Sequence, residues 1–435
     1  MISCSLSILS IAWGGYSSYC SPYWNSETIH DISGRNFIST LPRQSRLSSA
    51  EAERDIYYCQ KIICKFHPLC TRGMDKKVGQ YFNEAISTVN SQDSVSINEL
   101  YILLQKAVAS LKDAHTKVYA VNSQFRIANY SDCDEILEFG NIQFDSLAKE
   151  KFPFISSESY DWSRYQINQR LRDADGILSL GFSLDTAINI KYRSGKIIQE
   201  AILTEEDFTQ KQSSKISMSA DRIGGYTLSD STSTAYLKLD NCYYYTLQSV
   251  HRFNNNIRNM FSEIKERGIT NLILDLRNNP GGNQAIAIEF FKYLPIDKYQ
   301  IGKNEIRRGP FLFQTNGIRR NRFIKDLCFN GNIYVLTSLQ TFSAAMIFAD
   351  MLQGNNLAIV IGEVPGNAAT AYTNITHFVL PASRLSLNVS TLRRNKVDAS
   401  TGSIFIVPDV PCISSEAYSK AVKIIADTNE RQNNI

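Results

Sequence analysis

Hydrophobic and polar positions form their clearest pattern in the last third of the chain. Asn271–Arg277 is a nearly continuous apolar run, which is typical of a strand buried on both faces of a parallel sheet. Helices and strands are expected to alternate around it, starting with a strand at Thr234–Asp240 and a helix at Thr246–Arg267. The elements expected after the run are a helix at Ala285–Leu294, a strand at Asn332–Ser338, a helix at Ser343–Gln353 and a strand at Leu357–Gly362. This alternation predicts an α/β unit with a mostly parallel sheet.

Two capping boxes indicate where helices begin in the N-terminal region. Ser48 is followed three residues later by Glu51, and Ser96 in the same way by Glu99. Between them, Asp75–Val89 carries apolar residues at helical spacing. We therefore predict a helical unit over residues 47–116, preceded by an extension over residues 1–46.

The middle of the chain mixes both kinds of pattern. Short alternating segments predict strands near Glu135–Phe139 and Ala187–Tyr192, and a helix is expected near Ser163–Leu171. The predicted fold class is α/β in the core and α+β overall. The predicted domains that complete the chain are a middle α+β module over 117–225, an α/β core over 226–425 and a tail over 426–435.

The amino-acid composition argues against several classes of protein. The 435 residues carry 46 basic and 42 acidic side chains, so the net charge of +4 argues against nucleic-acid binding through bulk charge. No apolar stretch is long enough for a transmembrane helix. The nine cysteines show no paired CxxC spacing and there are five histidines, so a zinc site is not expected.

Three features could carry chemistry. Ser343 follows a predicted strand and opens a predicted helix, where unpaired amides favour developing negative charge. The alternative is a plain helix N-cap. Gly281 and Gly282 end the buried strand and could turn their amides toward an oxyanion, or form an ordinary tight turn. His115 lies just past a helix, at the junction of two predicted units, and could be a base or a structural histidine.

Together these features resemble the C-terminal-processing, tail-specific and tricorn-type serine proteases. The resemblance extends over about residues 50–412, and three segments carry it: Asn271–Asn283, Thr337–Ala345 and Ile359–Gly366. One branch of the family uses a Ser–Lys dyad, but this chain has no lysine between Lys325 and Lys396. The other branch uses a histidine in an Asp-x-His-Thr segment, which Asp113–Thr116 is similar to.

The resemblance implies a serine endopeptidase. Ser343 would attack a peptide carbonyl of an extended peptide or protein substrate, and His115 would act as the general base. Amides of Gly281 or Gly282 and of Ala344 would hold the oxyanion. Glu363 and Asp398 are candidates for the acid that orients the histidine. The resemblance implies no metal or organic cofactor. The alternative is an inactive member of the fold that binds a peptide or ligand.

Two further expectations concern the middle module and the location. Asp134–Gly140 is similar to a PDZ segment in which Cys133 stands where glycine is usual, and the alternative is an unrelated insertion. Family membership implies export or a specialised compartment. The apolar stretch Met1–Gly15 is compatible with a signal segment but lacks its basic residues, so a cytoplasmic location is the alternative. The sequence predicts no oligomeric state.

Overall fold

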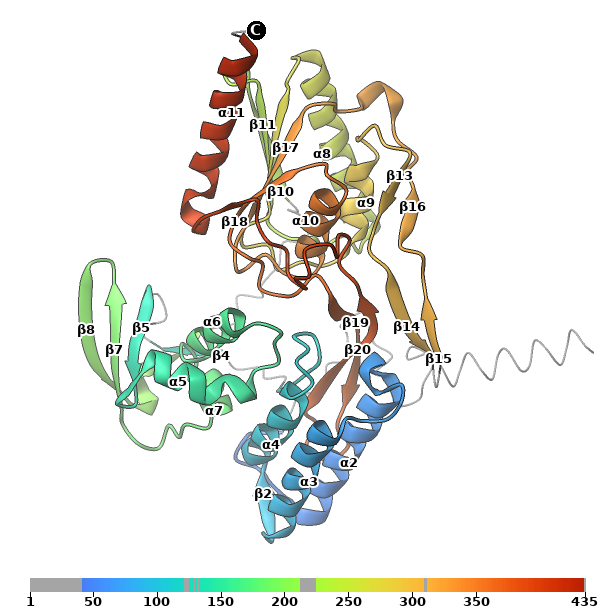
Figure 1. The fold of residues 1–435 in the computed structure, drawn as a ribbon. Helices are drawn as coiled ribbons and strands as arrows, with labels where there is room; N and C mark the ends of the chain where they lie inside the picture. Colours follow the sequence, from blue (N-terminus) through green and yellow to red (C-terminus); the bar gives the residue numbers. More distant parts are fainter. Residues whose placement is uncertain are drawn as a thin grey trace, which may run out of the picture. The chain divides into compact units, whose positions relative to one another are not determined.

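The structure is a computed structural model, shown in Figure 1. It describes residues 41–120, 125–128, 130, 133–211, 224–308 and 311–433, so the predicted signal segment at Met1–Gly15 lies outside the described residues. Within that described part, none of the helices is both long and apolar enough to cross a membrane. The chain forms two units. Unit 1 comprises Met1–Ser214, Glu305–Phe313 and Tyr372–Arg393, and unit 2 comprises Lys215–Asn304, Gln314–Ala371 and Arg394–Ile435.

Unit 2 is built on a six-stranded sheet with the strand order β10-β11-β12-β17-β18-β21. Only β10 runs antiparallel to its neighbour, and the other pairs are parallel. The strands are β10 (Gly224–Ser229), β11 (Thr234–Leu239), β12 (Asn271–Asp275), β17 (Asn332–Thr337), β18 (Ile359–Gly362) and β21 (Val410–Pro411). The predicted buried run is therefore β12, and its five residues are all buried.

Helices cover both faces of this sheet. Leu272 and Leu274 of β12 pack into the core formed with α8, α9 and α10, whereas Ile273 faces the core formed with α11. Figure 1 shows α11 on one side of the sheet and α8 to α10 on the other. The helices are α8 (Leu247–Glu266), α9 (Ala285–Phe291), α10 (Ala344–Gly354) and α11 (Ala417–Asn433). This three-layer arrangement confirms the predicted α/β fold class.

The smaller elements of unit 2 lie around these layers. Strands β13 and β16 form an antiparallel pair, and two short 3-10 helices connect larger elements. Their bounds are β13 (Lys298–Gln300), β16 (Ile318–Arg320), η5 (Lys325–Leu327) and η6 (Ser414–Glu416).

The N-terminal helices of unit 1 begin where the capping boxes predict. Ser48 accepts from the Glu51 amide and Ser96 from the Glu99 amide, and both glutamates bond back to the cap. Asp75 caps the helix between them. The elements of this part are β1 (Arg46–Ser48), α2 (Ser49–Phe66), η2 (Pro68–Cys70), α3 (Lys76–Asn90), β2 (Ser94–Ser96) and α4 (Ile97–Ala109).

Strands from distant parts of the sequence complete this helical core. The order in their sheet is β15-β14-β20-β19, and β3 pairs antiparallel with β20. Phe378, Leu387 and Val389 of this sheet are buried against the helices. The strands are β3 (Lys117–Tyr119), β14 (Asn304–Arg308), β15 (Phe311–Gln314), β19 (Ala371–Val379) and β20 (Ser386–Arg394). Unit 1 thus includes segments that lie far beyond the predicted helical unit in sequence, while the predicted domain boundaries stay a prediction.

The middle segment of unit 1 has a hydrophobic core of its own, which includes Ile136, Phe139 and Ile190. Its four-stranded sheet has the order β6-β5-β7-β8, and β4 pairs with β9. The likeness of this segment to a PDZ module stays a prediction. The elements are β4 (Phe125–Ala128), β5 (Glu135–Phe139), β6 (Ile142–Gln143), α5 (Phe144–Lys151), η3 (Phe152–Phe154), α6 (Tyr160–Arg170), α7 (Ala174–Ser179), β7 (Ile188–Ser194), β8 (Ile197–Leu203), η4 (Glu205–Asp207) and β9 (Phe208–Lys211).

Candidate active site

Ser343 lies on a strained turn between β17 and α10 in unit 2. Its backbone has φ 51° and ψ −119°, a region that residues with a side chain rarely adopt. Such a strand-to-helix turn is the kind of place that presents a nucleophilic serine. Ser343 stands at the N-cap position of α10, but its side chain makes no capping hydrogen bond. The plain N-cap role is therefore not the one this serine plays.

Main-chain and side-chain bonds from two neighbouring loops hold the turn. The Ser343 amide donates to Oδ1 of Asn367 at 2.7 Å, and the Phe342 amide donates to the Asn279 carbonyl at 2.9 Å. Thr341 donates through its hydroxyl to the Leu276 carbonyl at 2.8 Å. The strained conformation is thus held in place by the strand end of β12 on one side and by the loop after β18 on the other.

Gly281 lies directly against this turn. A Cβ atom at Gly281 would come within 2.6 Å of the Phe342 carbonyl oxygen, 2.7 Å of the Ser343 Cβ and 2.8 Å of the Ala344 nitrogen. Its φ of 94° also lies in the region that favours glycine. The predicted neighbourhood of the glycine loop, Ser343 and Ala344 is therefore present within unit 2.

The amide of Gly281 has a partner in this structure. It donates to Oδ1 of Asn279 at 2.9 Å, and Asn279 itself is buried and donates to the Leu239 carbonyl at 2.9 Å. At Gly282, a Cβ atom would lie only 2.4 Å from the Cys242 carbonyl oxygen. The glycines are thus required by close backbone approach. Sequence reasoning gave no role to Asn279, which lies inside a segment that carries the family resemblance, or to Asn367, which directly follows another such segment.

His115 lies in unit 1, on the loop between α4 and β3. Its side chain is almost fully buried, with 5% of the residue exposed. Its amide donates to Oδ1 of Asp113 at 2.9 Å, and its Nδ1 lies 3.9 Å from the same carboxylate oxygen. The next residue, Thr116, accepts a hydrogen bond from the Ser390 amide at 2.9 Å, which ties the loop to β20.

Asp113 lies between two imidazoles. Its Oδ2 is 3.1 Å from Nε2 of His67, and both side chains are fully buried. Burial alone would raise the pKa of Asp113, but the hydrogen bond with His67 and the two nearby imidazoles lower it overall. Burial lowers the pKa of His115 below its ordinary value, although Asp113 and the main chain of Tyr372 act in the opposite direction. The lowered pKa favours the neutral form of the His115 imidazole.

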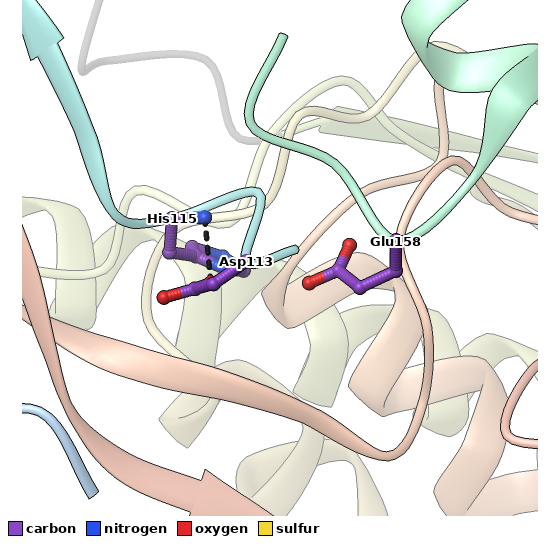
Figure 2. A group of neighbouring side chains, drawn as sticks. All are labelled: Asp113, His115 and Glu158. Atoms are coloured by element: carbon purple, nitrogen blue, oxygen red, sulfur yellow. Dashed lines mark hydrogen bonds and ion pairs between the residues drawn. The ribbon is translucent and has the colours of Figure 1, made fainter. Parts of the chain in front are cut away.

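A second acid lies beside this pair. Oε1 of Glu158 accepts from the Ala114 amide at 3.1 Å, and Figure 2 shows its carboxylate pointing toward Asp113 and His115. Asp113, His115 and Glu158 each offer one ligand atom, and these atoms lie within 4.8 Å of one another. One imidazole and two carboxylates could hold a divalent cation. Because Asp113 already bonds His67 and a main-chain amide, the cluster is also explained as a charge network around the histidine.

The two acids proposed from the sequence have partners within unit 2. Glu363 accepts from the Leu339 amide at 2.9 Å and from the Ser414 amide at 3.1 Å. Asp398 accepts from the Ser400 amide at 2.9 Å. Sequence reasoning missed Asp113 and Glu158 as neighbours of His115 and gave no role to His67. The signal for Asp113 was present in the Asp-x-His spacing, but nothing near Glu158 in the sequence connects it to the histidine.

Comparison with known proteins finds one family that matches the C-terminal half and solved structures that share the fold. Residues 233–411 match the family model of peptidase family S41. The solved structure of mature CPAF complexed with lactacystin shares the fold, with a TM-score of 0.63 at 12% identity over 88% of this chain and 98% of that chain. Mature CPAF alone matches with a TM-score of 0.61 at 12% identity over 87% and 96%. The match over residues 233–411 is therefore to a peptidase family, and the likeness to mature CPAF shows that the chain shares its fold.

Proposed function

We propose that this peptidase is an endopeptidase of the histidine-dependent branch, with Ser343 as nucleophile and His115 as general base. The observation that carries the proposal is the conformation of Ser343. It has a positive φ at the start of α10, and its side chain makes no capping hydrogen bond to that helix. A strained serine at a helix N-terminus is the arrangement from which an activated hydroxyl attacks a carbonyl. The proposal requires the Ser343 hydroxyl and the His115 imidazole to come within hydrogen-bond distance in the active protein.

The reaction proceeds in two halves. His115 takes the proton of the Ser343 hydroxyl as its oxygen attacks the peptide carbonyl, and returns it to the leaving amine as the acyl-enzyme forms. A water molecule, activated by the same imidazole, then hydrolyses the acyl-enzyme. Because the Gly281 amide donates to Asn279, we assign the oxyanion to the amides of Gly282 and Ala344. Gly281 contributes by allowing the close approach to Ser343 that a side chain would block.

We assign the orientation of His115 to Asp113. The carboxylate accepts the His115 amide and lies 3.9 Å from Nδ1, so it fixes the loop and places a negative charge beside the ring. That charge stabilises the imidazolium that forms when His115 takes a proton. His67 holds the other carboxylate oxygen and so keeps Asp113 in place. Asp113 is a positioning residue in this proposal, and Glu363 and Asp398 are not required.

The substrate class we propose is an extended peptide segment of a protein, bound by strand addition. Such a substrate is recognised through its backbone, which fits a chain whose net charge is only +4. No cofactor takes part in the proposed reaction.

A fluorophosphonate probe tests the proposal, because it reacts only with an activated serine. We expect the probe to label Ser343 in the native protein, and to label neither Ser343→Ala nor His115→Ala. Ser419→Ala is the control, since Ser419 is an exposed serine on α11 whose hydroxyl bonds only a main-chain carbonyl in this structure. Labelling that survives in His115→Ala would contradict the assignment of the base. No labelling of folded native protein at neutral pH would favour the alternative, a binding protein without turnover.

A further inference from the structure

Two cysteines of unit 1 lie together at the end of α2. Cys64 is in the last turn of α2 and Cys70 ends η2, so the chain folds back on itself between them. Their thiols are hydrogen-bonded to each other, with the Cys70 thiol donating to the Cys64 sulfur. Both are free thiols in this structure. We propose that Cys64 and Cys70 form a redox-active pair that closes to a disulfide when a peroxide oxidises Cys64.

The two thiols differ in exposure in the way such a pair needs. Cys70 is buried, with 2% of the residue exposed, whereas Cys64 is partly exposed. A peroxide can therefore reach Cys64, while Cys70 is protected from solvent and held beside it. The exposed thiol is the one oxidised first, and the buried thiol is the one that then reacts with the oxidised sulfur to form the disulfide.

Charge and hydrogen bonding activate Cys64. The hydrogen bond from Cys70 lowers the pKa of Cys64 to about 7, and the Arg307 guanidinium adds to this against the effect of burial. The same hydrogen bond raises the pKa of Cys70, so Cys70 keeps its proton. Arg307 is itself buried and donates to the His67 carbonyl at 2.6 Å, so its position near the pair is fixed.

Other cysteines of the described chain do not share this environment. Burial raises the pKa of each of four thiols: Cys59, Cys242, Cys328 and Cys412. Cys328 and Cys412 are partly exposed, as Cys64 is. They therefore serve as internal controls, because their thiolate fraction at neutral pH is smaller at comparable access.

The chemistry balances with one peroxide molecule. The Cys64 thiolate attacks one oxygen of hydrogen peroxide, the O–O bond breaks, and hydroxide leaves as Cys64 becomes a sulfenic acid. The Cys70 sulfur then attacks the Cys64 sulfur, the S–O bond breaks, and the proton of Cys70 leaves with the oxygen as water. Two thiols are oxidised, one peroxide is reduced, and two water molecules result. A dithiol reductant reverses the step.

The segment that such a disulfide would close contains His67. Its Nδ1 accepts from the Leu69 amide at 3.1 Å, and its Nε2 contacts Asp113. The redox state of the pair therefore acts on the same short segment that holds the imidazole next to Asp113. The link between the cysteine pair and His67 follows from where the pair lies in the chain. The proposal that Cys64 and Cys70 form a disulfide does not rest on the proposed peptidase function.

Peptide mapping of the full chain tests the proposal without measuring turnover. Trypsin cleaves after Lys61, Lys65 and Arg72, so Cys64 and Cys70 fall on separate peptides, 62–65 and 66–72. After brief treatment of the reduced protein with hydrogen peroxide and alkylation, we expect these two peptides joined by a disulfide that dithiothreitol reverses. At pH 7, Cys64 should react with a limiting alkylating agent about tenfold or more faster than Cys328.

Two variants and a control make the result decisive. Cys70→Ser should abolish the joined peptides and leave Cys64 oxidised to sulfinic acid, because the resolving thiol is lost. Arg307→Gln should slow alkylation of Cys64 several-fold, whereas Cys328→Ser should leave the joined peptides unchanged. The proposal is overturned if peroxide oxidises Cys328 while peptides 62–65 and 66–72 stay separate, with Cys64 and Cys70 both alkylated. It is also overturned if Cys64 forms its disulfide with a cysteine other than Cys70.

Discussion

The Ser343 turn and the His115 loop are built in opposite ways. The turn is defined by backbone geometry: a positive φ at Ser343, and a glycine whose missing Cβ lets two main chains touch. The loop is defined by buried charges, because Asp113 is held between His67 and His115. The comparison teaches that, of the two residues proposed for catalysis, one is held by backbone shape and the other by electrostatics. The two halves should therefore respond differently to substitution and to pH.

Removing the charge of Asp113 should have the largest effect of the substitutions that keep Ser343 and His115. Asp113→Asn keeps the shape but takes the carboxylate away from Nδ1, so the imidazolium loses its stabilising partner. We expect peptidase activity to fall by roughly 10³-fold, by analogy with the orienting acid of serine protease triads. Steady-state kinetics check this. Asp145→Asn is the control, since Asp145 is an exposed acid of unit 1 paired with Arg164. An Asp113→Asn enzyme with near-native turnover would remove Asp113 from the proposal.

Adding one methyl group beside Ser343 should have the next largest effect. In Gly281→Ala the new Cβ meets the Phe342 carbonyl oxygen, the Ser343 Cβ and the Ala344 nitrogen at 2.6 to 2.8 Å, on a backbone with φ 94°. We expect activity to fall by about 10²-fold and the free energy of unfolding to drop by on the order of 2–4 kcal/mol.

Thermal unfolding and turnover of the same samples measure both effects of Gly281→Ala. Gly225→Ala is the matched control, because a Cβ at Gly225 on β10 meets nothing within 4 Å. If Gly281→Ala and Gly225→Ala behave alike, shape is not what defines the Ser343 turn.

A smaller effect is expected at Asn367, which accepts the Ser343 amide at 2.7 Å. Asn367→Ala leaves this amide without that acceptor and relaxes the strained turn, so we expect turnover to fall by about tenfold. KM should change little, because the change acts on the position of the nucleophile. Asn316→Ala is the control: Asn316 also accepts a main-chain amide, from Ile318 at 3.1 Å, but in an exposed loop. Equal losses in the two variants would speak against a specific role for Asn367.

The smallest effect is a shift along the pH axis. Because burial lowers the pKa of His115, the acid limb of probe labelling at Ser343 should have its midpoint below the ordinary histidine value of about 6.5. Asp113 raises that pKa, so Asp113→Asn should move the midpoint to still lower pH. Gly281→Ala should reduce labelling without moving the midpoint. A midpoint above 6.5, or one that does not move in Asp113→Asn, would refute the claim that burial and the Asp113 carboxylate set the pKa of His115.

Local patterns made much of the fold predictable. The capping boxes at Ser48 and Ser96 set two helix starts within one residue, because a cap involves only residues three apart. The buried strand β12 and the start of α10 at Ala344 were predictable for the same reason, since an apolar run and a strand-to-helix change are local signals. The α/β class followed from their order along the chain.

What the sequence could not show depends on distant partners. Strands β19 and β20 complete unit 1 although each lies far along the chain from the helices it packs with, and no local pattern tells which sheet a strand joins. The same holds for the pair of His67 and Asp113, separated by 46 positions, and for Glu158 beside it. The turn at Ser343 could therefore be predicted from a local sequence motif. In the loop at His115, only the histidine itself could be predicted, and its buried charged neighbours could not.

The position of β20 sets an order of events during synthesis. Leu387 of β20 pairs with Val118, and the Ser390 amide bonds Thr116, so the loop that carries His115 is tied to a strand made late. A ribosome synthesises Ser343 before it reaches β20. Ser343, the proposed nucleophile, is therefore made while the loop of the proposed base still lacks that strand. With the roles proposed for Ser343 and His115, the unfinished chain is not expected to cut itself.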